Sequence, residues 1–245
     1  MARRRFRPRW WAALLTAAFV AVTIRLGHWQ GDRAAFKLSE QSTYDEALLA
    51  PPLPLPRPRD AVDRERFRRV SGEGRFDPDA LWYLDNRIHE GRAGYEVIQL
   101  FQLQPSDPSG TASAATRWLV VNRGWVPVGD DRSVLPPVET PDGVVALQGR
   151  INRAPSRRPG THDNAASRRL NYLDLGELER IGGKPVDTYV VELTGGPGWL
   201  GTERRPPAAR VETHRIYQLQ WYSMAALAAV LFVVLSLRKT DPADP

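Results

Sequence analysis

The residues best suited to chemistry in this chain are its four histidines, because neutral imidazole binds metal ions and exchanges protons near neutral pH. His89 and His162 lie in turn-like stretches, and solvent-exposed positions are the ordinary expectation for both. His28 and His214 differ, because each lies at the end of a long apolar stretch. The chain has no cysteine, which excludes disulfides, thiolate metal ligands and thiol catalysis.

The residues that follow His214 have helical spacing. Tyr217, Gln218 and Trp221 come three, four and seven positions later, so they share one face of a helix with the histidine. Neutral imidazole is a good axial ligand for haem iron, and aromatic neighbours suit a flat porphyrin. The same residue types also form the aromatic belt that anchors a membrane helix at the lipid–water boundary. The spacing alone leaves both interpretations open.

Sequence signatures of enzymes are missing. The chain has no Gly-x-Ser-x-Gly elbow, no His-Glu-x-x-His and no Walker loop. Gly196-x-Gly198-x-x-Gly201 matches the dinucleotide fingerprint by letter, but Pro197 interrupts it and the following residues, 204–207, do not begin a helix. We therefore expect a loop there, no catalytic residues, and a protein that is not an enzyme.

Two uncharged apolar stretches, Trp10–Ile24 and Leu219–Leu237, lie near the two ends of the sequence. With its flanks, each approaches the ~20 residues that a helix needs to cross a ~30 Å hydrocarbon core. We expect transmembrane helices over residues 10–30 and 211–238, in contact with membrane lipid. The protein is then a membrane hairpin with its folded domain between the two spans.

The formal charge of +6 is concentrated at these spans. Residues 31–213 contain 25 basic and 26 acidic side chains, and the remainder contains 9 basic and 2 acidic ones. A nearly neutral central domain excludes the basic surface of a nucleic-acid-binding protein. Positive charge beside a span stays on the cytoplasmic side. The basic tail 1–9 and the tail 239–245 should therefore be cytoplasmic, and the central domain periplasmic in a bacterial plasma (inner) membrane.

The alternative for the N-terminal span is a cleaved signal peptide of the twin-arginine type, since Arg3-Arg4-x-Phe6 matches part of that motif. The apolar stretch has no small-x-small cleavage site before Arg25, and it continues into Leu26–Gln30, a sequence typical of a membrane interface. A retained anchor is the favoured interpretation.

The central region divides into a helical extension with a proline-rich linker, residues 31–60, and a β-rich domain, residues 61–210. One short helix is expected over residues 174–181, with Asp174 as its N-cap and Gly182-Gly183 at its end. The expected strands, rich in Val, Tyr, Trp and Ile, are 67–76, 81–88, 95–103, 117–124, 144–151 and 188–193. Neighbouring strands favour a mainly antiparallel, barrel-like domain, because closure removes exposed edges.

Several of these segments together resemble the surfeit locus protein 1 family of cytochrome c oxidase assembly factors. The resemblance is carried by four segments: Leu26-Gly27-x-Trp29-Gln30-x-x-Arg33, Gly94-Tyr95-x-Val97, Asn122-Arg123-Gly124-Trp125-Val126-Pro127 and His214-x-x-Tyr217-x-x-Gln220-Trp221-Tyr222. The segments that begin at Asn122 and at His214 are the most specific. The hairpin arrangement agrees with the family, so the likeness covers nearly the whole chain.

The resemblance implies a chaperone for the haem-copper catalytic subunit of cytochrome c oxidase that holds and delivers haem a. His214 then becomes the candidate ligand of the haem iron, with Tyr217 and Trp221 against the ring. His28, at the same membrane face, is a geometric candidate for a second ligand. Arg25 and Arg33 are candidates to neutralise a propionate. Candidate partner-binding residues are Arg123, Trp125, Trp29 and Arg33.

A haem-free membrane adaptor is the alternative function. In that case the helices and the central domain dock the nascent oxidase subunit or the haem a synthase, and His214 is only a belt residue. The segment Asn122–Pro127, with Arg123 and Trp125 as surface candidates, then matters more than the helix ends.

The orientation is testable with reporter fusions. A periplasm-dependent reporter fused near Ser109 should be active, because the central domain is expected outside the cytoplasm. The same reporter fused after Lys239 should be inactive. Activity only from the fusion after Lys239 would reverse the orientation.

Overall fold

The computed structural model describes residues 4–58, 60–104, 118–154, 168–202 and 211–239. Ser109 and His162 lie outside these ranges. The chain forms two compact units, residues 1–42 with 207–245, and residues 43–206.

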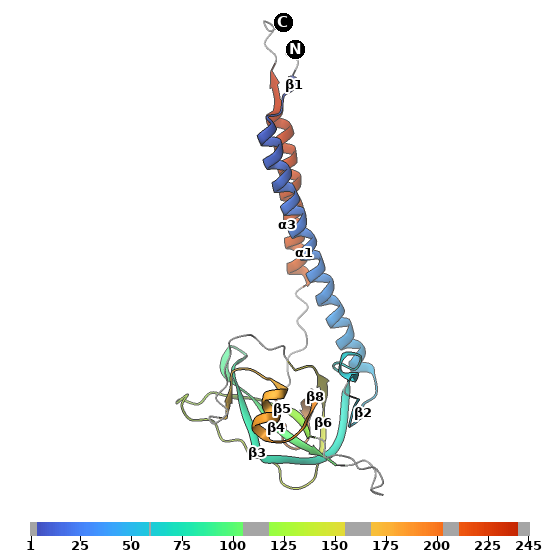
Figure 1. Cartoon of the computed structure of the whole chain (residues 1–245), viewed down its shortest axis with the longest axis vertical. Helices are drawn as coiled ribbons and strands as arrows, with labels where there is room; N and C mark the ends of the chain where they lie inside the picture. The colour runs from blue at the N-terminus through green and yellow to red at the C-terminus, as the bar shows by residue number, and fades with distance from the viewer. Residues whose placement is uncertain (1–3, 59, 105–117, 155–167, 203–210, 240–245) are drawn as a thin grey trace. The chain divides into compact units, whose positions relative to one another are not determined.

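The first unit is a pair of antiparallel helices (Figure 1). It contains α1 (Trp10–Leu49) as far as Ser42, and α3 (Val211–Ser236). The short strands β1 (Arg4–Phe6) and β9 (Leu237–Lys239) pair antiparallel beside the helix ends. Both helices are long and apolar enough to cross a membrane, and only 11% of the most apolar window of each is buried. Apolar side chains that face outward are consistent with a membrane protein.

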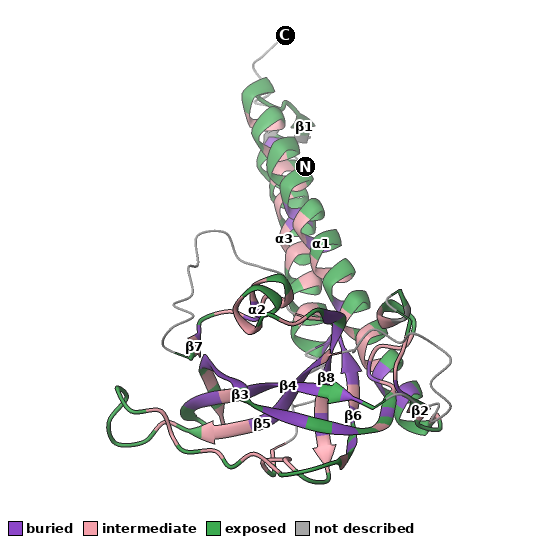
Figure 2. Cartoon of the chain, turned by 60° about the horizontal axis from the view of Figure 1, so that its bottom comes forward, coloured by how far each residue is buried: buried purple, intermediate pink, exposed green. Residues whose placement is uncertain are grey.

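The second unit is built on a seven-stranded sheet (Figure 2). Its strands are β2 (Leu53–Pro54), β3 (Arg69–His89), β4 (Arg92–Leu103), β5 (Trp118–Pro127), β6 (Val145–Asn152), β7 (Arg169–Leu170) and β8 (Val186–Gly195). The strand order is β2-β3-β4-β5-β8-β6, β6 also pairs with β3, and β7 pairs with β3. A 3₁₀ turn (Ala61–Asp63) precedes β3.

The sheet is mixed, so the expected mainly antiparallel arrangement is wrong, and we do not describe the domain as a barrel. β5 and β8 are parallel, as are β2 and β3, and β7 and β3. The cause is a long-range pairing: β8 lies between β5 and β6, parallel to the first and antiparallel to the second. Strand composition does not encode which distant strand enters between two neighbours, whereas local hairpins such as β3–β4 can be expected from sequence.

The expected strands over 67–76 and 81–88 are one strand, β3. The turn-like residues Asp77-Pro78-Asp79 lie at a register shift between Phe76 and Leu81 in its pairing with β4. A bulge of this kind absorbs extra residues and bends a strand without ending it. The expected turn is therefore an irregularity within β3.

Alternating residues of the central strands pack on the two faces of the sheet. Phe101 and Val121 belong to one buried cluster, whereas Leu100 and Val120 belong to the other. α2 (Leu175–Gly182) contributes Leu178 to the second cluster. This helix confirms the expected short helix: Asp174 accepts a hydrogen bond from the Glu177 amide, and Gly183 closes it with a positive φ of 63°.

A β-bulge in β5 determines the direction of its most polar side chains. Val97 pairs with Gly124 and Ile98 with Asn122, so Arg123 has no partner on β4. Gly124 has a φ of +119°, a conformation that side-chain-bearing residues rarely adopt. Bulges commonly re-aim a side chain. Here the Arg123 side chain lies inside the domain.

Arg123 is 2% exposed, so the expectation that it lies on the surface is wrong. Its guanidinium donates 2.7 Å hydrogen bonds to the Gly198 and Glu139 carbonyls and to Gln99 Oε1. It also lies 5.3 Å from the Phe76 ring centroid. Burial lowers the pKa of Arg123 from its ordinary value, because desolvation disfavours the charged form. The side chain joins β4, β5 and two loops.

Arg123→Met tests this role. The substitution leaves one buried acceptor, Gln99 Oε1, and two part-buried carbonyls without their donor, so we expect the free energy of unfolding to fall by about 3–5 kcal/mol. Chemical denaturation of the full chain in detergent measures it. Arg153→Met is the control, because Arg153 is exposed and its ion pair with Asp63 should contribute about 1 kcal/mol or less. Equal losses in the two variants would contradict the proposed structural role.

Candidate functional site

The helix pair of the first unit is in close contact at two glycines of α1. A methyl group on Gly27 would lie 2.4 Å from Tyr222 Cε1, and one on Gly31 would lie 2.5 Å from Gln218 Nε2. The two glycines are four residues apart, the spacing at which small residues let membrane helices approach closely. Tyr222 and Gln218 on α3 have the same spacing. The polar residues between the glycines are therefore brought against α3.

His214 is held by the first helix. Its Nδ1 atom lies 2.7 Å from Gln30 Oε1. When the Gln30 oxygen accepts this hydrogen bond, Nδ1 is the donor, and in the neutral ring Nε2 then keeps its lone pair. Ligand histidines in metal sites are commonly oriented in this way, by a hydrogen bond from the second ring nitrogen to an oxygen. The His214 side chain is half-buried, so Nε2 belongs to a fixed but partly accessible ring.

His28 is bound to a different residue of α3. Its Nδ1 atom lies 3.3 Å from the Tyr222 hydroxyl, and the two rings meet edge to face with centroids 5.8 Å apart. Gln218 Nε2 donates to the same hydroxyl over 3.5 Å. The two histidines predicted from sequence are therefore in the same helix pair, each with its own partner across the interface.

The other residues singled out on the helices are more exposed. Tyr217 is 47% exposed and Trp29 is 50% exposed, whereas Trp221 is half-buried. The Arg33 guanidinium lies 5.8 Å from the centroid of the Trp29 ring. His214, Gln218 and Tyr222 are the residues of α3 in contact with α1. Tyr217 was expected on the same face and is not among these contacts.

Two shallow grooves flank His28 within the helix pair. One, of about 450 Å³, is lined by Arg25, Leu26, His28, Trp29 and Asp32. The other, of about 360 Å³, includes His28, Asp32, Arg215 and Gln218. Both combine apolar walls with charged groups, a combination suited to an amphipathic ligand.

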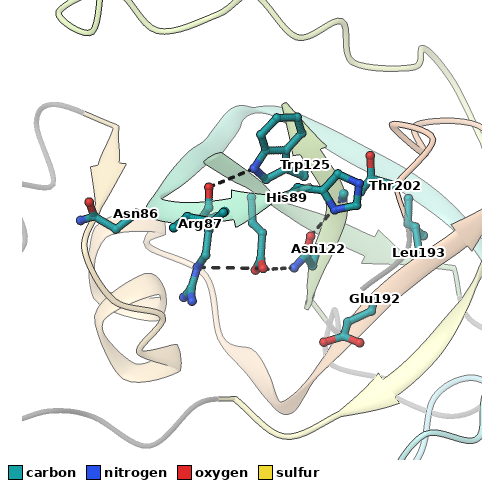
Figure 3. Close-up of a pocket in the computed structure, with 11 residues that line it drawn as sticks. Asn86, Arg87, His89, Asn122, Trp125, Glu192, Leu193 and Thr202 are labelled. Carbon is teal, nitrogen blue, oxygen red and sulfur yellow. Dashed lines mark hydrogen bonds and ion pairs between the residues drawn. The ribbon is translucent and has the colours of Figure 1, made fainter. Parts of the chain in front are cut away.

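A separate pocket of about 360 Å³ lies in the sheet domain, where β3, β4, β5 and β8 meet (Figure 3). Trp125 forms one wall and donates from Nε1 to the Arg87 carbonyl over 3.1 Å. A methyl group on Gly94 would lie 2.4 Å from the Trp125 ring. The lack of a side chain at this position therefore leaves room for the ring. His89 lies beside the indole with ring centroids 5.4 Å apart. Two segments noted in the sequence, at Gly94 and at Asn122–Pro127, therefore meet at one pocket.

Metal sites built from side chains alone are not found in the described ranges: no group of three or more His, Asp or Glu side chains there could hold a metal ion.

Sequence reasoning missed Gln30, Gly31 and Tyr222 as members of the helix site. The Gly-x-x-x-Gly spacing of Gly27 and Gly31 was the available signal. Gln30 was noted only as part of the segment Leu26–Gln30, and its partner, 184 positions away in sequence, could not be identified from that segment. Sequence reasoning also missed His89 as a pocket residue, because a histidine at a strand end is ordinarily a turn residue.

These features define a class of protein: two apolar helices, joined by polar contacts, with a mixed-sheet domain between them in sequence. The chain belongs to the SURF1 family, whose model matches residues 17–226. It is 27% identical over 236 residues to surfeit locus protein 1 of Homo sapiens, covering 88% of this chain and 74% of the human protein. It is 26% identical over 246 residues to surfeit locus protein 1 of Xenopus tropicalis, covering 94% and 76%. An uncharacterized SURF1-like protein of Mycobacterium tuberculosis is 26% identical over 238 residues, covering 91% and 82%. The family membership suggested by the sequence segments is thereby confirmed.

Gly27→Val tests the close approach of the helices. The branched side chain meets the rigid Tyr222 ring, so α1 and α3 should separate at this level. The chain has no native cysteine, which allows Gln30→Cys and His214→Cys to be crosslinked with a short bismaleimide. We expect efficient crosslinking in the parent pair and a several-fold lower yield with Gly27→Val.

Ala21→Val is the matched control, since Ala21 is an exposed residue of the same helix and should leave the crosslinking yield unchanged. An equal yield in all three proteins would show that the glycine does not set the helix contact.

Proposed function

We propose that this protein is an assembly factor for haem-copper cytochrome c oxidase, which holds haem a and delivers it to the catalytic subunit. The observation that supports this most directly is the hydrogen bond between His214 Nδ1 and Gln30 Oε1. With this hydrogen bond donated by Nδ1, the Nε2 atom of the neutral imidazole is available as an axial ligand. Its role is that of a chaperone, without a catalytic residue.

The residues around His214 fit an amphipathic macrocycle. His214 Nε2 would hold the iron of haem a, and the neighbouring side chains would contact the ring and its propionates. Tyr217 and Trp221 offer aromatic surface on the same helix, and Arg25 and Arg33 offer positive charge for the propionates. His28 is the candidate for a second ligand, and its contact with the Tyr222 hydroxyl orients its ring.

The proposed membrane location of the protein agrees with the chemistry of haem a. Burying each methylene of a farnesyl tail contributes roughly 0.8 kcal/mol, so a farnesylated haem partitions into the membrane. Two apolar helices give the protein access to that phase. We propose that it resides in the bacterial plasma membrane with both termini cytoplasmic and its sheet domain periplasmic, as the distribution of arginines indicates.

The adaptor function remains a second candidate because of the pocket around Trp125. All residues that line this pocket belong to the second unit and none belongs to the proposed haem site, so the pocket is a candidate surface for docking a protein. On this alternative the partner is the nascent oxidase catalytic subunit or the haem a synthase, and no haem is retained.

Optical spectra distinguish the two functions. Protein purified from cells that make haem a should show a Soret band, and His214→Ala should abolish it. Gln30→Leu should weaken haem retention roughly 10–100-fold, because it removes the group that orients the ligand imidazole. Retention is measured as the rate of haem transfer to apomyoglobin.

Thr213→Ala is the matched control, since Thr213 is an exposed neighbour of the ligand histidine and should leave the spectrum unchanged. A Soret band that survives His214→Ala unchanged removes this histidine as ligand. The lack of a band in the wild type supports the adaptor.

A further inference from the structure

The strands β1 and β9 lie together at one end of the helix pair, where Figure 1 shows β1 beside the end of α3. They pair antiparallel, with the Cα partners Arg4–Lys239, Arg5–Arg238 and Phe6–Leu237. The Arg7 amide extends the contact by donating to the Ser236 carbonyl over 2.8 Å. Basic residues from distant parts of the sequence are thereby brought to one place.

Two successive pairs between β1 and β9 place a basic residue opposite a basic residue. Like charges directly opposite each other destabilise a strand pair. The sequence adds to this effect, because residues 1–9 and 237–245 together have seven basic and two acidic side chains, a net charge of +5. A bound anion offsets such repulsion. This end of the helix pair is therefore suited to an anionic ligand.

The arginines that lead into α1 are open to a ligand. The exposed ones are Arg5, Arg7 and Arg9. In the described part of this unit, the acidic residues lie beyond the apolar stretches from this end, at Asp32, Glu40 and Glu212. The described carboxylates of the helix pair are therefore at its other end, and they leave the charge of these arginines for a ligand from outside the unit.

Exposed aromatic side chains adjoin the arginines. Trp10 is 79% exposed, Trp11 is 47% exposed and Phe6 is 52% exposed. The Phe6 ring lies edge to face against Phe232, with centroids 6.2 Å apart, and the Arg9 guanidinium lies 5.8 Å from the Trp11 centroid. Tryptophan beside basic residues is typical of the boundary between lipid and water. A ligand that uses all of these groups has an anionic head and an apolar part.

We propose that β1, β9 and the first turn of α1 form a binding site for an anionic phospholipid. The guanidinium groups donate to its phosphodiester, whose geometry they match, and the acyl chains lie along the exposed apolar surface that begins at Trp10. Clusters of basic residues directly beside a membrane span are typical of sites for anionic lipids. A free phosphate ion would leave the aromatic surface unused.

The site lies at the opposite end of α3 from His214, so it does not rest on the proposed haem function. A zwitterionic phospholipid carries the same phosphodiester but brings its own cation. It therefore offsets less of the positive charge at this end and should bind more weakly.

Native mass spectrometry of the full chain in a non-ionic detergent tests the proposal, because each bound lipid adds its own mass. We expect phosphatidylglycerol to be retained with at least a fivefold preference over phosphatidylcholine with the same acyl chains. The double variant Arg5→Gln/Arg238→Gln should lower this preference several-fold. The paired strands should survive the change, since it removes a pair of like charges. Arg5→Lys/Arg238→Lys, which keeps the charge, should retain most of the preference.

Arg75→Gln/Arg92→Gln is the matched control, because both are exposed residues of the sheet domain and the double variant has the same net charge. It should leave the lipid preference unchanged. Equal retention of the two lipids by the wild type, an equal loss in the control, or displacement of phosphatidylglycerol by millimolar inorganic phosphate would each overturn the proposal.

Discussion

The proposed haem site depends on the close approach of α1 and α3 at Gly27. Because this glycine has no side chain, the Tyr222 ring packs directly on the backbone of α1. Interhelical contact at this distance places Gln30 within hydrogen-bond reach of His214, and His28 within reach of Tyr222. Without it, two polar groups in an apolar helix pair would lack partners, which is costly in an environment of low dielectric constant. One small residue thus permits the polar contacts on which the proposed haem site is built.

In the sheet domain, glycines also allow neighbouring side chains to take positions that a larger residue would prevent. Gly124 accepts a positive φ at the bulge, Arg123 turns into the interior, and Trp125 forms the wall of a surface pocket. Gly94 on the neighbouring strand provides the space for the indole. A buried arginine is expensive unless its donors are satisfied, and here two carbonyls and Gln99 satisfy them. Adjacent residues of one motif therefore have separate roles, one in stability and one at the surface.

Local features of the fold were predictable from sequence, and long-range ones were not. The two apolar helices and α2 with its Asp174 cap follow from hydropathy and capping residues, which act over a few positions. The insertion of β8 between β5 and β6 depends on distant pairing. His214 was a candidate because a histidine beside an apolar span is unusual, whereas Gln30 has no such signal. Arg123 is expected on the surface because arginine side chains are usually exposed. The β-bulge turns this side chain into the interior instead.

The proposed haem site requires that Gln30 hold His214 with its proton on Nδ1 and its lone pair on Nε2. Nitrogen-15 spectra of histidine-labelled, haem-free protein in nanodiscs test it most directly, because the chemical shifts of the two ring nitrogens identify the tautomer. With His214→Ala used to assign the signals, the account predicts a protonated Nδ1 and a bare Nε2 for His214, and loss of this preference in Gln30→Leu. A proton on Nε2 in the wild type, or spectra unchanged by Gln30→Leu, would contradict it.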